Sequence, residues 1–191
     1  KRSDIRKDQD VAIIGAGFLG LLLIQLSKAE GARVTAVSKR KSSLQAALDA
    51  GADFVCDLGA ENAETEISQL TGGKGYERVI ECTGKQEPLD RAGKICAIRG
   101  RLIIGGYHQD GLRQINLQEW NWKGLDVINA HERDPQVYRQ GTEEAIRAIL
   151  EGRMRPAGFY THYFPFERIR EALDLQARAP EGFIKAIVTF D

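Results

Sequence analysis

The sequence lacks an excess of charge of either sign and a long apolar run. Its 191 residues hold 27 Lys and Arg against 27 Asp and Glu, so no overall field attracts nucleic acid or an anionic membrane surface. No stretch has the length of a membrane-spanning helix, and the first residues lack the apolar core of a signal peptide. We therefore expect a cytoplasmic protein whose partner is a small molecule, with no nucleic acid and no membrane.

The sequence also lacks a set of cysteines that could form disulfides or a metal site. Cys56, Cys82 and Cys96 lie in apolar stretches, without the C-x-x-C spacing or the histidine partners of a zinc site. We expect them to be buried free thiols in a reducing compartment.

The length of the chain leaves room for one domain and a smaller remainder. The first ten residues are polar and charged and have no initiator Met, so we expect residues 1–10 to be a linker or the cut end of a longer protein. Residues 11–141 are predicted to form the domain, and the pattern changes from residue 142 to the end.

The most informative stretch is an apolar run followed by three spaced glycines. Val11–Ile14 is predicted to be a strand buried on both faces, as in a parallel sheet. Gly15 would allow a tight turn, Gly17 a close approach of the backbone to a pyrophosphate, and Gly20 the packing of a helix on the strand. That helix would direct free N–H groups and partial positive charge at the diphosphate. The alternative is an ordinary turn in which glycine only supplies a positive φ.

The predicted second strand ends where the adenosine ribose of a dinucleotide would lie. Arg33–Val37 leads to Ser38, eighteen residues after the third glycine, where an NAD site normally has Asp or Glu for the ribose 2′-hydroxyl. The stretch from Ser38 to Ser43 has no carboxylate and includes Lys39 and Arg40. Hydroxyls and cations bind a 2′-phosphate through charge-assisted hydrogen bonds, so we predict NADP rather than NAD, bound by these four residues. The alternative is a solvated charge run that opens the next helix.

Strands and helices continue to alternate, which predicts an α/β fold with a doubly wound parallel sheet. Four further strands are expected at 53–56, 78–82, 101–104 and 125–129, with helices between them that include 42–50 and 89–96. The prediction is a six-stranded Rossmann sheet with a C-terminal strand-helix-strand extension. Ligands of such sheets lie beyond the carboxyl ends of the strands. Thr83 and Gly84, and Gly105 and Gly106, would then face the cofactor ribose and nicotinamide, although each glycine also suits a plain turn.

The remaining residues follow a different pattern. After a helical stripe that ends at Gly152, strands are expected near 159–164 and 184–190, with a helix from about 167 to 177. The sheet is already complete by residue 130. Residues 142–191 therefore either decorate the sheet or pack on a catalytic domain that this sequence does not contain.

Several stretches, taken in order, carry a family resemblance. The chain resembles the coenzyme-binding half and the C-terminal segment of the medium-chain dehydrogenases/reductases, of the zinc alcohol and sorbitol dehydrogenase type. The resemblance covers nearly the whole chain and implies the NADP-binding portion of an oxidoreductase that acts on an alcohol, polyol or ketone. The supporting stretches are Val11–Gly20, Gly51–Asp53, Glu81–Gly84, Trp122–Gly124 and Phe164–Val188.

The resemblance also implies roles for individual residues. Phe18 and Leu19 would lie over the pyrophosphate, and Lys185 would contact it from the C-terminal segment. Ser38 and Lys39 fall at the adenine-ribose position, where NADP-dependent relatives tend to have a serine and a basic residue.

The sixth strand has two implied roles. Backbone groups at its end, near Asn129, would contact the nicotinamide carboxamide. The resemblance also implies a homodimer in which the sixth strands pair, which would cover an open sheet edge.

The sequence departs from the family in one large respect. Family members have an N-terminal domain with the catalytic zinc ligands, or with the substrate pocket in zinc-free members, and nothing here corresponds to it. His108, His131 and His162 are scattered without ligand spacing, so we expect them to be surface or turn residues. Zinc is therefore expected only in the missing domain, no catalytic residue is assigned, and the isolated chain should be inactive.

Three other functions remain open. The chain is also compatible with part of a zinc-free quinone or enoyl reductase, although the Glu81–Gly84 stretch favours the zinc type. A second possibility is a Rossmann module that binds or senses a dinucleotide without catalysis. The third is a methyltransferase-like sheet for adenosylmethionine, against which the complete glycine pattern and the serine-basic stretch argue.

Aromatic residues of the last segment distinguish part of an oxidoreductase from a Rossmann module that only senses a dinucleotide. A segment adapted to a separate catalytic domain should leave its aromatic side chains partly exposed, whereas a self-contained sensor should bury them. The aromatic residues in question are Phe159, Tyr160, Tyr163, Phe164 and Phe183.

Overall fold

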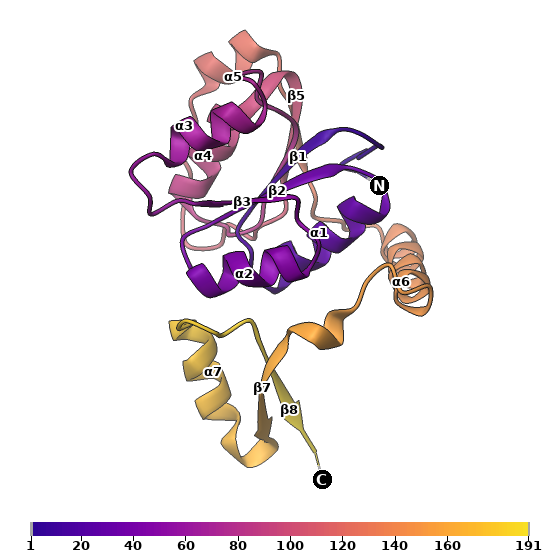
Figure 1. Cartoon of the computed structure of the whole chain (residues 1–191). Coiled ribbons are helices and arrows are strands. Elements are labelled where there is room, and N and C mark those ends of the chain that lie inside the picture. Colours follow the sequence, from indigo (N-terminus) through magenta and orange to yellow (C-terminus); the bar gives the residue numbers. More distant parts are fainter. Residues whose placement is uncertain (1, 191) are drawn as a thin grey trace.

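The centre of the molecule is a parallel sheet with the strand order β3-β2-β1-β4-β5-β6 (Figure 1). The computed structural model describes residues 2–190. The expected doubly wound α/β fold is confirmed. The six strands are β1 (Asp10–Ile14), β2 (Arg33–Ser38), β3 (Phe54–Asp57), β4 (Tyr76–Glu81), β5 (Cys96–Ile104) and β6 (Asp126–Asn129).

Helices cover both faces of the sheet, which is why β1 is apolar at every position after its first. Val11 and Ile13 pack in one core with α1 and α2, and Ala12 and Ile14 pack in a second core with α3, α4 and α5. No helix within residues 2–190 is long and apolar enough to cross a bilayer. The helices are α1 (Phe18–Ala29), α2 (Lys41–Asp49), α3 (Ala63–Leu70), α4 (Gln86–Ile95) and α5 (Leu117–Lys123).

The chain order of the strands reverses between β1 and β4. β1 is followed by β2 on one side, whereas its other neighbour, β4, comes later in the chain. The connections leave this point in opposite directions, and in open α/β sheets the crevice that binds the ligand lies at the carboxyl edge of such a point. The glycine turn after β1 lies at this crevice.

In the C-terminal segment, α6 lies beside the domain, and β7, α7 and β8 lie as a small unit below the sheet in Figure 1. Its two strands pair in parallel, with a helix between them. The expected strand-helix-strand extension is therefore confirmed. Its elements are α6 (Pro135–Leu150), η1 (Pro156–Phe159), β7 (Tyr160–Pro165), η2 (Phe166–Arg168), α7 (Ile169–Arg178) and β8 (Lys185–Thr189).

Side chains tie this unit to the start of α2. Arg40 Nη1 donates hydrogen bonds to the backbone carbonyls of Ala179, Pro180 and Phe183, at 3.1, 3.3 and 2.9 Å. The carboxylate of Glu181 accepts from the hydroxyl and from the backbone N–H of Ser42, the latter at 3.0 Å. The turn between α7 and β8 is thus anchored to the domain that contains the six-stranded sheet.

Several predicted boundaries differ from the structure. α6 begins at Pro135 and runs across the predicted boundary between residues 141 and 142. The helix expected at 89–96 is α4, which ends at Ile95, and β5 begins at once at Cys96 rather than at residue 101. α5 was not predicted, because seven residues are too few for a helical period to stand out.

The first residues are not a free linker. Arg78 Nε donates to the carbonyl oxygens of Ser3 and Asp4, at 2.9 and 3.2 Å, and Asp8 donates its N–H to Gly31 at 2.9 Å. Ile5 packs against the core that contains α1. Residues 2–9 are therefore part of the packed domain.

An ion pair at the start of β3 gives the fold a pH-dependent contribution. The Asp53 carboxylate accepts hydrogen bonds from Lys28 Nζ at 2.7 and 2.8 Å and from the Val34 N–H at 2.7 Å. Partial burial raises the pKa of Asp53, but these hydrogen bonds outweigh it, so the pKa lies below its usual value. The folded state therefore binds this proton less readily than the unfolded state, and stability is gained above the unfolded pKa.

We expect Asp53→Asn to lower the free energy of unfolding by about 1 kcal/mol at pH 7, the size of a typical hydrogen bond. The difference from the parent chain should shrink as the pH falls through the lowered pKa, because the parent carboxyl then becomes neutral too. Urea unfolding at pH 7 and pH 3 measures both effects. Glu61→Gln, which removes an exposed carboxylate, is the matched control and should change neither value. A difference that grows at pH 3 would contradict the account.

Candidate functional site

The glycine turn after β1 is packed too tightly for other residues at two positions. Gly15 has φ +98°, and a Cβ there would lie 2.5 Å from Cγ2 of Thr83. A Cβ on Gly20 would lie 2.0 Å from the carbonyl oxygen of Gly15. α1 therefore starts directly against the turn, and the turn touches the end of β4.

Gly17 differs from its neighbours because it faces open space. A Cβ built on it would meet no atom within 4 Å. Gly17 is the N-cap of α1, where no side chain accepts a hydrogen bond and the first turn has no acidic residue. The start of the helix thus keeps its partial positive charge uncompensated, beside a space that even a methyl group would begin to fill. This arrangement fits a diphosphate.

The two residues after Gly17 lie differently. The ring of Phe18 stacks on Tyr160 of β7, with centroids 6.0 Å apart, and Lys185 Nζ lies 5.5 Å from the Phe18 centroid. Leu19 is exposed at the helix start. The C-terminal segment therefore brings the cation of Lys185 next to the first residue of α1, on the side of the candidate diphosphate site.

The four residues predicted at the adenosine end separate into two pairs. Ser38 is half-buried at the end of β2, and Lys39 Nζ lies 2.5 Å from Oε2 of Glu87. Arg40, in contrast, is engaged with the three carbonyls of the C-terminal turn, and the Ser43 hydroxyl is buried in α2 without a hydrogen-bond partner. Ser38 and Lys39 thus lie at the surface, with Lys39 in an exposed ion pair, whereas Arg40 and Ser43 are held inside the fold.

β4 ends in a buried carboxylate that the sequence interpretation did not assign to the site. The side chain of Glu81 is fully buried and accepts from the N–H groups of Thr83 at 2.6 Å and Gly84 at 3.0 Å, and from the Thr83 hydroxyl. Its own carbonyl accepts from the N–H groups of Gly105 and Gly106, both at 2.8 Å. The predicted residues after β4 and β5 are thus brought together, with Glu81 between them.

One of the three histidines also lies here: His108, half-buried in the loop after β5. Its Nε2 lies 3.1 Å from Oε2 of Glu81, and its Nδ1 accepts from Arg113 Nε at 2.9 Å. Lys85 and Arg113 hold the pKa of Asp110 well below its usual range through hydrogen bonds. Nothing in the sequence indicated this contact, because His108 and its partner Glu81 are 27 residues apart.

The remaining predicted residue, Asn129, ends β6 next to β5. Its side chain is exposed, and Oδ1 accepts from the N–H of His131 at 2.9 Å. The amide is therefore used within its own loop, and only backbone groups face the neighbouring strand, where Asn129 pairs with Ile104.

The three cysteines are free, and their thiols are unreactive by environment. Burial raises the pKa of Cys56 to about 12 and of Cys96 to about 11. Burial, with a further effect from Glu81, also raises the pKa of Cys82 beside the crevice. Neutral thiols are poor nucleophiles and poor metal ligands. Within residues 2–190, no group of three or more His, Cys, Asp or Glu side chains is arranged to hold a metal ion.

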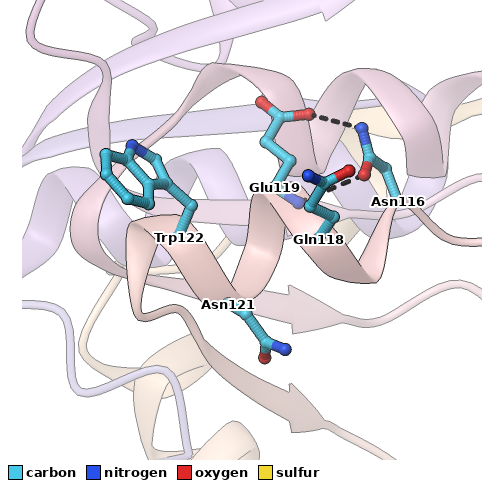
Figure 2. Close-up of a pocket in the computed structure, with 5 residues that line it drawn as sticks. All are labelled: Asn116, Gln118, Glu119, Asn121 and Trp122. Carbon is cyan, nitrogen blue, oxygen red and sulfur yellow. Dashed lines mark hydrogen bonds between the residues drawn. The ribbon is translucent and has the colours of Figure 1, made fainter.

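Two hollows lie outside the glycine crevice. Figure 2 shows one of about 580 Å³ on α5, lined by Asn116, Gln118, Glu119, Asn121 and the 87% exposed Trp122. The other, of about 510 Å³, includes Tyr76 and Cys96, the first residues of β4 and β5, in its lining. The second hollow is therefore at the opposite edge of the sheet from the crevice.

Comparisons with known proteins agree with this geometry. Residues 19–149 match the family described as zinc-binding dehydrogenases. The NAD-dependent alcohol dehydrogenase of Sulfurisphaera tokodaii is 32% identical over 181 residues, which cover 91% of this chain and 49% of that protein. The NADP-dependent isopropanol dehydrogenase of Clostridium beijerinckii is 31% identical over 193 residues, covering 97% of this chain and 54% of that protein.

A solved structure shares the fold of the whole chain. The zinc-dependent alcohol dehydrogenase 2 from Streptococcus pneumonia, solved in the apo form, superimposes with a TM-score of 0.90 at 24% identity, over 100% of this chain and 54% of that one. The chain thus spans about half the length of the relatives it matches. From the family match, the relatives and the fold together, the chain belongs to the zinc-binding dehydrogenases of the medium-chain dehydrogenase/reductase family and corresponds to their coenzyme-binding part.

Proposed function

We propose that this chain is the NADP-binding part of an oxidoreductase that transfers hydride between the nicotinamide and an alcohol, polyol or ketone. The observation that carries the proposal is the open, uncapped start of α1 at Gly17, in the crevice between β1 and β4. The diphosphate would lie against the backbone N–H groups of Phe18 and Leu19. Lys185 would add a positive charge from the C-terminal segment.

The choice of NADP rests on Ser38 and Lys39. The Lys39–Glu87 pair is 56% and 54% exposed, and such pairs contribute little to stability. A 2′-phosphate carries more charge than the single carboxylate of Glu87 and can displace it from Lys39 at small cost, while the Ser38 hydroxyl donates to a phosphate oxygen. Relatives of both cofactor types occur, so these two residues are the specific support for NADP.

The nicotinamide half would lie beyond the ends of β4, β5 and β6. Thr83, Gly84, Gly105 and Gly106 would form the wall there, and the glycines let the two loops pack closely, because a Cβ on Gly84 would lie 2.5 Å from the carbonyl oxygen of Tyr107 and one on Gly106 2.2 Å from the backbone nitrogen of Gly84. The end of β6, at Asn129, would contribute a backbone group for the carboxamide. The bound dinucleotide supplies or accepts the hydride at its nicotinamide C4.

The substrate side would come from outside this chain. A catalytic zinc and the group that moves the hydroxyl proton are proposed to lie in the other half of a longer protein. Tyr163, 62% exposed, together with exposed Phe166 and Phe190, offers an apolar surface for that half. Phe159 and Phe183 are instead buried: Phe159 packs in the core beside α1, and the ring centroid of Phe183 lies 5.3 Å from that of His162.

Buried Phe159 and Phe183 favour a second candidate, a dinucleotide-binding module that acts without catalysis. The outward-facing Tyr163 and Phe166 argue for the first candidate.

We also propose a homodimer in which β6 pairs with its copy, because β6 is an open edge of the sheet and Val127 on it is partly exposed. With its reduced thiols, the protein is proposed to work in the cytoplasm.

Fluorescence titration of the chain with NADPH and NADH tests the proposal. We expect NADPH to bind at least about tenfold more tightly, a difference of about 1.4 kcal/mol from the 2′-phosphate contacts. Tighter binding of NADH would contradict the NADP assignment, and no binding of either would contradict the site itself. The chain alone should not oxidise NADPH with a panel of ketones. Turnover by the isolated chain would show that the chemistry does not need a second half.

A further inference from the structure

We infer that Glu81, His108 and Arg113 are positioning residues that hold the loops after β4 and β5 for the nicotinamide half of the dinucleotide, without acting on its adenosine half. The inference rests on the proposed function and deepens it. It follows from the hydrogen bonds of a buried carboxylate, the tautomer of one histidine and the strand order of the sheet.

Burying a carboxylate is costly unless donors compensate its charge. Glu81 is fully buried, and three of its donors, the two N–H groups and one hydroxyl of Thr83 and Gly84, belong to the three residues that follow it. The charge therefore fixes the shape of the loop after β4. If this position only had to end the strand, burying an apolar side chain there would cost less free energy than burying a carboxylate.

The direction of the hydrogen bonds through His108 is determined by Arg113. A guanidinium only donates, so the contact of 2.9 Å from Arg113 Nε leaves Nδ1 of His108 without a proton. The proton of the neutral ring is then on Nε2, which donates to Glu81 at 3.1 Å. Donor and acceptor match at every step from Arg113 through His108 to Glu81.

A further hydrogen bond closes the path from Arg113 through His108 to Glu81 into a ring. Arg113 Nη2 donates to the carbonyl of Gly84 at 2.8 Å. The backbone carbonyl of Glu81 holds the N–H groups of Gly105 and Gly106. The loop after β4 and the loop from Gly105 to Arg113 are therefore joined by both the main chain and the side chain of one residue.

The strand order confines the effect to one side of the crevice. β4 and β5 lie on one side of β1, and β2, which ends at Ser38, lies on the other. Thr83 is in contact distance of the turn at Gly15, so the joined loops form the wall of the crevice beyond the diphosphate. A defect in them should affect the nicotinamide ribose and ring and leave the adenosine end unchanged.

Glu81→Gln is the sharpest test, because it keeps the shape and removes the acceptor. One carboxylate oxygen becomes an NH₂ group that must face Thr83, Gly84 or His108, all of which donate. We expect NADPH to bind at least tenfold more weakly and to lose its nicotinamide fluorescence enhancement. Binding of 2′,5′-ADP, the adenosine half alone, should stay within twofold of the parent chain.

Two further variants complete the design. Glu64→Gln removes a surface carboxylate that pairs with Lys94 and should change neither affinity. Arg113→Lys keeps the charge and loses the Nε–H, so it should reproduce the selective loss if Glu81→Gln fails to fold. Equal weakening of both ligands, or no weakening in either variant, would overturn the inference. Failure of the parent chain to bind NADPH and 2′,5′-ADP would instead overturn the proposed function.

Discussion

Gly17→Asp should bind NADPH about 100-fold more weakly than the parent chain, a loss of about 2.8 kcal/mol, while its unfolding temperature stays the same or rises. The open space at Gly17 is the reason for this separation. The new side chain would occupy the proposed path of the diphosphate and place a negative charge against it.

The fold should tolerate this change because of the backbone at residue 17. Gly17 has φ −87° and ψ −169°, an extended conformation, and it is the N-cap of α1. Aspartate is among the preferred N-cap residues and stabilises a helix start by roughly a few tenths of a kcal/mol relative to glycine. Thermal unfolding followed by circular dichroism and NADPH titration measure the two effects separately.

Gly141→Asp is the matched control, because Gly141 also faces open space, in α6. It should leave NADPH affinity unchanged. Gly20→Ala is the opposite case, since its Cβ would lie 2.0 Å from the Gly15 carbonyl oxygen. It should lower the unfolding temperature together with the affinity. Unchanged NADPH binding by Gly17→Asp would refute the placement of the diphosphate.

Ser38→Asp should reverse the cofactor preference. A carboxylate at the end of β2 repels a 2′-phosphate and accepts a hydrogen bond from a ribose 2′-hydroxyl. We expect NADPH affinity to fall about 30-fold and NADH affinity to rise several-fold, a combined change of about 3 kcal/mol in the difference between the two. Parallel titrations with NADPH and NADH measure that difference directly.

The variant Ser68→Asp, at an exposed position of α3, controls for added charge and should leave both affinities unchanged. Lys39→Ala should weaken NADPH binding without improving that of NADH. If Ser38→Asp weakens both dinucleotides equally, Ser38 lies outside the adenosine ribose site. The preference of the chain would then depend on other residues.

The centre of the sheet could be predicted from sequence because β1 and β2 are buried on both faces. Runs such as Val11–Ile14 need no alternation, and glycines follow closely after β1, β4 and β5. The start of β5 could not, because Arg99 has φ +58° and the register with β4 shifts near this point. A strand with an irregular start lacks the period on which sequence interpretation depends.

The candidate site was predictable where function depends on the backbone, and less so where it depends on distant side chains. The spacing of Gly15, Gly17 and Gly20 is local, so it is visible in ten residues of sequence. The partners of Arg40 are 139 to 143 residues away. Nothing in the local sequence indicates that this arginine donates hydrogen bonds to those carbonyls. Glu81 was visible as part of the Glu81–Gly84 stretch, but its role as a buried acceptor depends on His108, 27 residues away.

The bonds between Arg40 and the turn after α7 bear on where this polypeptide can be divided. Cutting it between residues 141 and 142 would split α6 within its length and leave the guanidinium without its three acceptors. It would also remove Phe159 from the core beside α1, and Lys185 from the helix start. The smallest fragment with an intact nucleotide crevice therefore includes the C-terminal strands. A boundary between residues 141 and 142 would divide the chain into a domain and a tail, but the packing joins these two parts.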